Sequence, residues 1–384
     1  MIPYGRHDIT QADIDAVIDV LQSDFLTQGP QVPAFEQKVA AYCGAGHGVA
    51  VNSATSALHV ACLALGLGRG ERLWTSPVTF VASANCGLYC GASVDFVDID
   101  PRTYNLCADS LAQKLEIADG EGRLPKIVVP VHLAGQPCDM REIYQLSQRY
   151  GFRILEDASH AIGGRYLDET IGNGRYSDIT VFSFHPVKIV TTAEGGMALT
   201  NDAELAHRMR LFRSHATTRE ADRMTKPPDG PWYYQQIDLG YNYRMTDIEA
   251  ALGISQLDRI DTYVARRREL AARYDQMLEE LPVTTPWQHP DGQSAMHLYI
   301  IRLQSETGRS HRAVFEALRE RGVGVNLHYI PVHLQPYYRQ LGFEPGQYPE
   351  AEAYYQEAIS LPLFPALSEE DQDSVVAALQ EALA

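Results

Sequence analysis

The sequence predicts an α/β protein with a mostly parallel central sheet covered by helices, followed by a smaller C-terminal α+β domain. A chain of 384 residues is long enough for one large domain and a smaller one. Its hydrophobic fraction of 45% and charged fraction of 21% are typical of a packed globular protein. Short apolar runs alternate with helical stretches through the first half, which is the pattern of strands buried on both faces.

The N-terminal elements can be justified in order. The segment 8–23 is expected to be a helix, because Thr10 and Asp13 resemble a capping box and apolar residues follow at helical spacing. A second helix is expected to begin near Pro33. The strands of the sheet are then expected at the apolar runs 48–51, 72–75, 94–99, 127–132, 153–156, 179–184 and 197–200.

The C-terminal part has a different texture. A helix to about residue 215 and a polar loop over 217–232 precede a long connecting helix, expected over roughly 246–280. The elements expected after it are a strand over 297–303, a helix over 311–321, a second strand over 325–329 and two terminal helices. We therefore divide the chain into a large domain, 1–240, and a small domain, 241–384, which includes the connecting helix.

The composition excludes several classes of function. Lys and Arg number 32 against 49 Asp and Glu, so the formal charge of −17 argues against nucleic acid or an anionic membrane as a partner. No apolar run approaches the ~20 residues of a membrane span, and the first residues lack the features of a signal peptide, so a cytoplasmic protein is expected. The six cysteines form no zinc-binding pattern, and no metal is expected.

Several familiar motifs are missing. The glycines of 44–48 precede a strand and lack the third glycine of a dinucleotide loop. The sequence contains no GxxxxGK[ST], HExxH or GxSxG. Nicotinamide dehydrogenases, P-loop enzymes, zinc proteases and α/β-hydrolases therefore lose support.

Three segments carry candidate chemistry at the strand ends. Thr55 and Ser56 follow a strand and open a helix, where free amides and the helix dipole favour a phosphate; ordinary helix capping is the alternative. Asp157 ends a strand, with His160 three residues later; a capping acid and a buried histidine are the alternative. Lys188 lies among apolar residues, where desolvation lowers a lysine's pKa and favours a Schiff base; a lysine that reaches solvent is the alternative.

The three segments together are more specific than any one of them. A phosphate cradle, a strand-end acid and, about 30 residues later, a lysine follow the order of a pyridoxal 5'-phosphate site. In such a site the lysine forms the Schiff base, and the carboxylate keeps the pyridine nitrogen protonated so that the ring can take up electrons.

The chain resembles the sugar aminotransferases of the DegT/DnrJ/EryC1/StrS family, which have the type I fold of PLP-dependent transferases, that of aspartate aminotransferase. The resemblance extends over nearly the whole chain. It is carried by Leu26-Thr27-Gln28-Gly29-Pro30, Ser53-Ala54-Thr55-Ser56-Ala57-Leu58, Thr79-Phe80-Val81-Ala82, Glu156-Asp157-Ala158, Phe182-Ser183-Phe184-His185-Pro186-Val187-Lys188, Glu194-Gly195-Gly196 and Gly240-Tyr241-Asn242-Tyr243-Arg244-Met245.

The resemblance implies roles for individual residues. Lys188 becomes the Schiff-base lysine and proton carrier, Asp157 the partner of the pyridine nitrogen, and His160 a neighbour of the cofactor's phenolic oxygen. The remaining cofactor contacts are implied for Phe80, which stacks on the ring, and for Thr55, Ser56 and Ser183, which contact the phosphate. Asn242 is implied to reach the phosphate in the neighbouring subunit, which makes the active unit a homodimer with shared sites.

A subgroup resemblance bears on the substrate. The start Ile2-Pro3-Tyr4-Gly5 and the segment Thr191-Thr192-Ala193-Glu194 resemble the transaminases of pseudaminic acid biosynthesis. That likeness implies amination at C4 of UDP-2-acetamido-2,6-dideoxy-L-arabino-hex-4-ulose, with L-glutamate as the donor. The residues expected to bind substrate are Tyr4, Thr27, Gln28, Arg244, Asn326 and His328.

Three alternatives remain open from the sequence. The first is a family member acting on another nucleotide-linked 3-keto or 4-keto sugar. The second is a PLP enzyme that does not transaminate, and the third is a non-catalytic regulator that has kept the fold.

Overall fold

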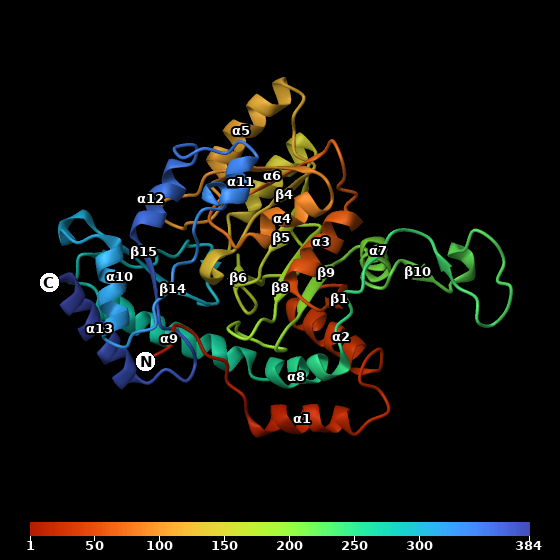
Figure 1. The fold of residues 1–384 in the computed structure, drawn as a ribbon, viewed down its shortest axis with the longest axis horizontal. Helices are drawn as coiled ribbons and strands as arrows, with labels where there is room; N and C mark the ends of the chain where they lie inside the picture. The colour runs from red at the N-terminus through yellow and green to blue at the C-terminus, as the bar shows by residue number, and fades with distance from the viewer.

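A seven-stranded, mostly parallel sheet forms the centre of the computed structural model, which describes residues 1–384 (Figure 1). The pairs β8–β5, β5–β4, β4–β2 and β2–β3 are parallel, whereas β9 runs antiparallel to both β8 and β1. The strands in sheet order are β1 (His47–Val51), β9 (Gly196–Thr200), β8 (Ile179–Ser183), β5 (Arg153–Asp157), β4 (Ile127–Val129), β2 (Arg72–Thr75) and β3 (Ser93–Phe96). The predicted α/β fold class is confirmed.

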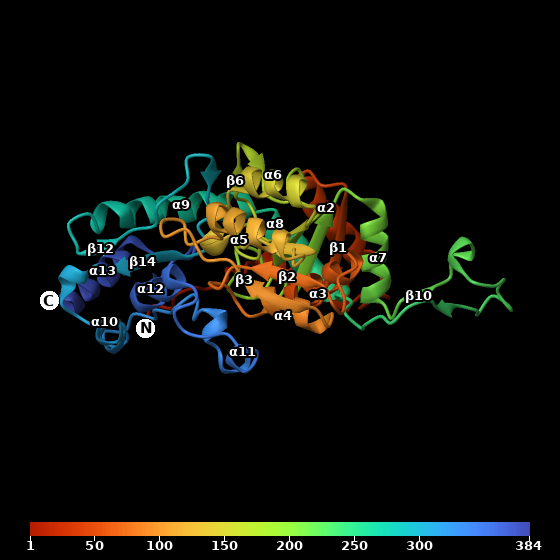
Figure 2. The same ribbon diagram turned by 90° about the horizontal axis from the view of Figure 1, so that it is seen from above.

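Helices cover both faces of the sheet because successive strand residues point to opposite sides. In β8, Val181 packs into the apolar cluster under α3, α4 and α7, whereas Phe182 packs into the one that contains residues of α2 and α8 (Asp247–Leu257). Figure 2 shows α5 and α6 on one side of the sheet and α3 and α4 on the other. The helices of this part are α2 (Gln31–Cys43), α3 (Ala54–Ala64), α4 (Ala82–Tyr89), α5 (Ala108–Gly120), α6 (Met140–Tyr150) and α7 (Ala203–Arg213).

The N-terminal helix α1 (Gln11–Leu21) is shorter than expected but has the predicted cap. The backbone amide of Thr10 donates to the Asp13 carboxylate at 2.8 Å, which fixes the start of the helix. Asp13 is buried and also accepts from Arg259 at 2.6 Å, and this contact ties α1 to the packing around α8. The apolar residues on the outer side of α1 stay exposed; they include Ile14, Ile18 and Leu21.

The prediction of one continuous helix over 246–280 is wrong. The structure has two helices, α8 (Asp247–Leu257) and α9 (Ile260–Met277), with non-helical backbone at Arg259. The Arg259 side chain donates hydrogen bonds to Tyr263, one turn further on, and to Asp13, which is far away in the sequence. The contact with Asp13 favours a break in the helix at this point. As a result α8 packs on α1 and α2, while α9 runs on into the C-terminal core.

A three-stranded antiparallel sheet organises the C-terminal part. Its strands are β12 (Val283–Thr284), β14 (Tyr299–Leu303) and β15 (Ala358–Leu361), and its helices are α10 (His311–Glu320), α11 (Pro336–Gln340), α12 (Pro349–Glu357) and α13 (Glu369–Leu383). Apolar residues of α9, α10, α13 and this sheet form one core cluster. The division of the chain at residue 240 stays a prediction.

The prediction of a strand over 325–329 is also wrong. That segment pairs with the small sheet at only one bridge, between Asn326 and Ser360, and the strand that the sequence did not predict, β15, pairs with β14 instead. Side chains replace the missing ladder, because Asn326 accepts from the amide of Leu327 and His328 bonds to Ser360. The segment is therefore free to line a cavity.

A long excursion leaves the body of the protein after α7. It contains the short hairpin β10 (Thr217–Thr218) and β11 (Gln235–Gln236), and Figure 2 shows it extending well beyond the helices. The remaining elements are β6 (Arg165–Tyr166), β7 (Glu169–Thr170), β13 (Gly292–Gln293) and the short 3₁₀ turns η1 (Leu133–Gly135), η2 (Ala221–Arg223), η3 (Ser305–Thr307) and η4 (Val332–Leu334).

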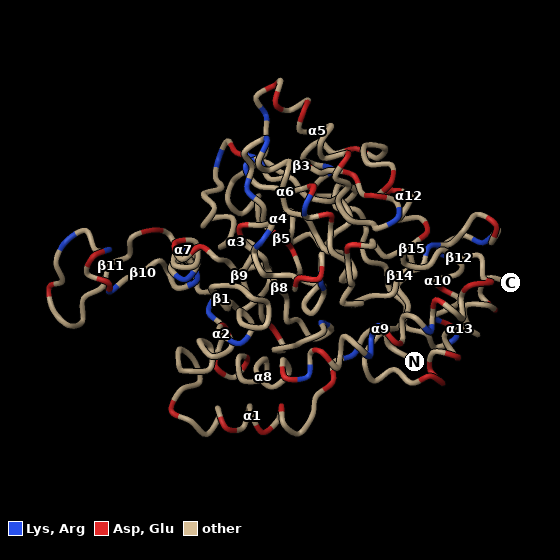
Figure 3. The backbone as a smooth tube through the Cα atoms, turned by 180° about the vertical axis from the view of Figure 1, so that it is seen from behind, with Lys and Arg blue, Asp and Glu red and all other residues tan.

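The charges are spread over the backbone. Acidic and basic residues are interspersed in most elements, although α1 carries acidic residues only (Figure 3). None of the helices combines the length and the hydropathy needed to span a bilayer.

Candidate active site

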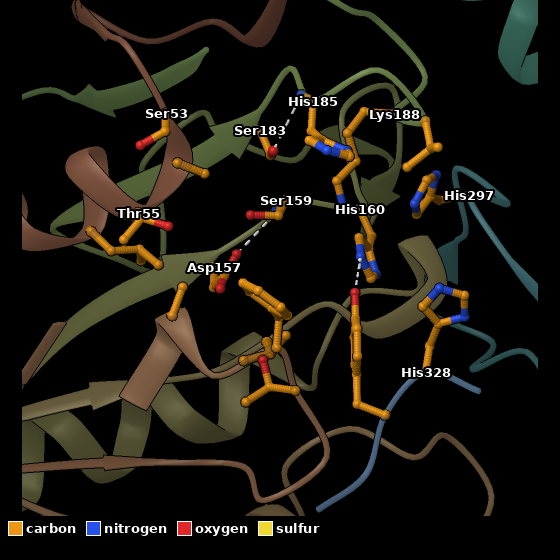
Figure 4. Close-up of a pocket in the computed structure, with 18 of the residues that line it drawn as sticks. Ser53, Thr55, Asp157, Ser159, His160, Ser183, His185, Lys188, His297 and His328 are labelled. Carbon is orange, nitrogen blue, oxygen red and sulfur yellow. Dashed lines mark hydrogen bonds between the residues drawn. The ribbon is translucent and has the colours of Figure 1, made fainter. Parts of the chain in front are cut away.

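One cavity of about 430 Å³ opens where β5 and β8 end, and it is lined by 23 residues. A volume of this size is in the range of sites for small molecules. It brings together residues from segments that are far apart in the chain (Figure 4). The sequence-predicted residues that line it are Tyr4, Thr55, Phe80, Asp157, His160, Ser183, Lys188, Asn326 and His328.

One side of the cavity is the N-terminus of α3. Ser53 caps the helix and accepts from the amide of Ser56 at 3.1 Å. The amides of Ala54 and Thr55 make no hydrogen bond within the protein, so they remain free to hold an anion. The hydroxyl of Ser56 donates instead to Asn52 at 2.7 Å, and Ser56 does not line the cavity.

The cradle also depends on a glycine of the neighbouring strand. A Cβ atom added at Gly196 would lie 2.5 Å from the backbone nitrogen of Ala54 and 2.6 Å from the carbonyl oxygen of Ser53. The strand β9 can approach the helix start this closely only without a side chain. Thr55 and Ser183 then supply hydroxyl groups beside the free amides.

Asp157 lies between this cradle and the lysine (Figure 4). Its side chain is only 5% exposed. One carboxylate oxygen accepts from the hydroxyl of Ser83 at 2.6 Å, and the other accepts from the amide of Ser159 at 3.1 Å. These bonds fix the orientation of the carboxylate at the end of β5, where it can pair with a cationic ring nitrogen.

Lys188 reaches the far side of the cavity from the loop after β8. Burial lowers the pKa of its amine from 10.5 to about 7, and the negative charge of Asp157 opposes that change. The amine is therefore largely unprotonated just above neutral pH, which is the form that attacks a carbonyl carbon. Buried Ile189 and Val190 anchor the loop behind it.

Three histidines surround the lysine. His160, His297 and His328 are buried, and burial together with the nearby Lys188 keeps the pKa of each below its usual value, for His328 at about 3. The imidazole rings of His160 and His297 lie 4.4 Å apart, centroid to centroid. All three are neutral at physiological pH, so they offer hydrogen bonds without adding positive charge.

The sequence missed several lining residues. They are Ser53, Ser159, His185, Glu194, His297 and Tyr329, among others. Ser53, His185 and Glu194 lie within the motifs quoted from the sequence, and Ser159 follows one directly, so their neighbours signalled them. His297 and Tyr329 come from the C-terminal part and carry no local signal, because only the packing of that part on the sheet brings them to Lys188.

Five predicted substrate or cofactor residues lie outside the cavity. They are Ser56, described above, and Thr27, Gln28, Asn242 and Arg244. Two of these residues pair with other segments through isolated β-bridges: Thr27 with Thr246, and Asn242 with Ser214. The segment that carries Asn242 and Arg244 thus lies beside the loop that follows α1.

The site fits pyridoxal phosphate. The free amides at α3 and the hydroxyls of Thr55 and Ser183 suit a phosphate, Asp157 suits a protonated ring nitrogen, and the unprotonated amine of Lys188 suits a Schiff base. The sheet topology and this donor set define a PLP-dependent enzyme.

Comparisons with known proteins give the particular family. Residues 7–380 match the DegT/DnrJ/EryC1/StrS aminotransferase family, and the chain belongs to it. It is 40% identical over 385 aligned residues to the spore coat polysaccharide biosynthesis protein SpsC of Bacillus subtilis, covering 99% of this chain and 96% of that protein.

Solved structures agree with this assignment. Helicobacter pylori PseC, an aminotransferase involved in the biosynthesis of pseudoaminic acid, is 30% identical, with a TM-score of 0.89 and coverage of 100% and 99% of the two chains. The putative sugar aminotransferase Spr1654 of Streptococcus pneumoniae in its PMP form has a TM-score of 0.90, 30% identity and the same coverage. The protein is a PLP-dependent sugar aminotransferase with the type I fold.

Proposed function

We propose that the enzyme moves an amino group from L-glutamate to C4 of a UDP-linked 4-keto-6-deoxy-N-acetylhexosamine, as in pseudaminic acid biosynthesis. The observation that carries the proposal is a cavity with Lys188, Asp157 and an anion cradle in a chain that resembles PseC over its full length. The cofactor supplies an electron sink that makes both half-reactions possible.

The chain's own residues divide the work. Lys188 binds the cofactor and, when released, carries a proton between the reacting carbon atoms, for which its lowered pKa suits it. Asp157 holds the proton on the ring nitrogen. Phe80 is 58% exposed at the cavity, so its aromatic face is available to cover the ring.

The phosphate end needs little cationic charge. Thr55 and Ser183 donate hydroxyl hydrogen bonds beside the free amides of α3, and the helix dipole adds to their effect. A local site of this kind binds an anion in a protein of formal charge −17. Ser56, proposed from the sequence as a third phosphate ligand, supports the cradle through its bond to Asn52.

The sugar-nucleotide site is proposed to be built from residues of two subunits. Tyr4, Asn326 and His328 line the same cavity as Lys188, and the Tyr4 and His328 rings lie 5.3 Å apart. Thr27, Gln28, Asn242 and Arg244 lie outside it and are proposed to act in the neighbouring subunit's cavity, Asn242 on the phosphate and the others on the sugar nucleotide.

A homodimer with shared sites follows from that proposal. Exposed apolar residues support an interface, because a patch of this kind is unusual on a monomer. They gather on α1 and the segments just before and after it, next to the segment of Asn242, and are Ile9, Ile14, Ile18, Leu21, Phe25 and Leu26.

The shared site can be tested by complementation. Lys188→Ala and Asn242→Ala are each expected to be inactive or weak, but co-expressed subunits should regain activity. Random pairing makes about a quarter of the sites wild type, because half of the dimers are mixed and one site in each is intact. If co-expression restores nothing while each variant still forms dimers, Asn242 does not act across the interface.

The substrate is tested directly. The purified enzyme with L-glutamate is offered a set of UDP- and dTDP-linked 4-keto and 3-keto sugars, and mass spectrometry shows which one gains an amino group. We expect the wild-type enzyme to aminate the UDP-linked 4-keto-N-acetyl sugar. The Lys188→Ala variant should leave this sugar unchanged. Wild-type turnover by Lys188→Ala would contradict the mechanism.

A second substrate class has its own support. The 40% identity to SpsC favours an amino sugar of a surface polysaccharide, made from another nucleotide-linked 3-keto or 4-keto sugar. The same assay decides between the two. A cytoplasmic location is proposed as well, since all six cysteines are free, as in a reducing compartment.

A further inference from the structure

Tyr329 occupies a position in the cavity to which no role has been assigned. Its hydroxyl oxygen lies 3.1 Å from Nε2 of His160, the histidine implied to meet the cofactor's phenolic oxygen. Its ring lies 6.1 Å, centroid to centroid, from that of Phe80, which is proposed to cover the same cofactor ring. Tyr329 therefore lies beside both residues.

The hydrogen bonds of His160 determine its tautomer. The backbone amide of Ala134 donates to Nδ1 of His160 at 3.2 Å, so Nδ1 carries no proton. Burial and the nearby Lys188 keep the pKa of His160 well below its usual value, so the ring is neutral and its single proton is on Nε2. That proton is directed to the oxygen of Tyr329.

Both nitrogens of His160 are thus engaged, and the ring has no further proton to donate. The Tyr329 oxygen accepts from His160, so its own proton must be directed elsewhere. It has no acceptor among the hydrogen bonds of the protein, and the residue lines the cavity. A hydroxyl that lines a cavity with a spare proton can donate it to a bound ligand.

We propose that Tyr329, oriented by His160, is a catalytic residue that donates a hydrogen bond to the phenolic oxygen of the bound cofactor. The proposal rests on the proposed function in so far as it requires the cofactor to be joined to Lys188. His160 then acts as a positioning residue, and the hydrogen bond to the phenolic oxygen is made by a residue of the C-terminal part.

The bond has a measurable consequence. The phenolic oxygen is negative and stabilises the proton on the nitrogen that joins Lys188 to the cofactor. A donor to that oxygen draws off part of its charge and so lowers the pKa of this nitrogen. Without the donor, the nitrogen keeps its proton to higher pH. The other titratable groups of the cavity that face this pair are Asp157, Lys188, His297, His328 and Tyr4.

The test is a spectroscopic pH titration of the holoenzyme in wild type and Tyr329→Phe. The visible band of the lysine-bound cofactor changes as the nitrogen loses its proton. We expect the midpoint in Tyr329→Phe to rise by about one pH unit, a tenfold change in proton affinity. Tyr338→Phe is the control, because Tyr338 is a hydrogen-bonded tyrosine of the same C-terminal part, but its hydroxyl donates to Asn85 outside the cavity; its midpoint should equal that of wild type.

A second measurement addresses His160 without the cofactor. Nitrogen NMR of the cofactor-free protein, with labelled histidine, should show His160 neutral with its proton on Nε2. An unchanged midpoint in Tyr329→Phe, or a proton on Nδ1 of His160, would overturn the inference. If the wild type itself shows no visible band that borohydride abolishes, it is the proposed function that fails, because no cofactor is joined to Lys188.

Discussion

Replacing Lys188 with methionine should stabilise the cofactor-free protein below neutral pH. This gain in stability should disappear at alkaline pH. The structure holds the amine in a cavity where burial lowers its pKa from 10.5 to about 7. The unfolded chain therefore binds a proton more tightly than the folded chain does. Between the two pKa values the stability of the wild-type protein must therefore rise with pH. The destabilisation caused by the buried, charged amine of Lys188 is fully present below about pH 7.

The magnitude follows from the interval between the two pKa values. At about 1.4 kcal/mol for each unit, the interval corresponds to about 5 kcal/mol as an upper bound. The side chain is only partly buried and the cavity admits water, which screens the amine, so about 2 kcal/mol is the expected gain in Lys188→Met. With an unfolding entropy of about 2.1 cal/mol/K per residue, that raises the melting temperature by about 2–3 °C.

The assay is thermal unfolding of the cofactor-free proteins at a series of pH values from 6 to 10. The difference between Lys188→Met and wild type should be largest near pH 6 and shrink steadily towards pH 10. Lys226→Met is the control, because Lys226 is an exposed lysine in the excursion after α7, and its difference from wild type should not change over this range.

One companion variant sharpens the test. Asp157 opposes the effect of burial on Lys188, so Asp157→Asn should move the pH dependence to lower pH. A stability difference between Lys188→Met and wild type that stays flat from pH 6 to 10 would refute the reasoning, since the amine would then have an ordinary pKa.

Three further variants test the packing around the site. Gly196→Ala should lose about 1–3 kcal/mol of stability and bind cofactor weakly, because its Cβ would lie 2.5 Å from the Ala54 nitrogen; chemical unfolding and cofactor titration measure both, and wild-type values would contradict the close approach. Thr55→Val should weaken cofactor binding about tenfold by removing a hydroxyl from the cradle, with the melting temperature of the cofactor-free form unchanged; equal affinity would show that the amides suffice. Glu156→Ala should cost on the order of 3 kcal/mol, because it leaves the buried His132, 2.7 Å away, without its partner; a loss under 1 kcal/mol in urea unfolding would show that the pair contributes little.

Local patterns predicted the sheet well because its strands are continuous apolar runs. Asp157 and Lys188 could be recognised because each lies at or just beyond the end of a central strand, where topology alone brings side chains to one edge. The capping box of α1 was equally readable, since Thr10 and Asp13 bond within one turn.

The failures share one physical cause, which is dependence on distant partners. The helix expected over 246–280 breaks at Arg259, whose side chain is held by Asp13, some 250 residues earlier. The segment 325–329 resembles a strand in its apolar pattern, but β15 pairs with β14 instead and leaves it a single bridge.

The class of this protein can be read from its residues in order: an α/β sheet, a phosphate cradle, a strand-end acid and a lysine in the order of a PLP site. Those features are local, so neighbouring residues suffice to specify them. How the site is completed depends on the packing of the whole chain. That packing brings Tyr329 to His160 and His297 to Lys188, keeps Asn242 out of the cavity, and lowers the pKa of the lysine. Burial, electrostatic fields and hydrogen-bond partners all arise from side chains far apart in the sequence, and they exist only once the chain has packed.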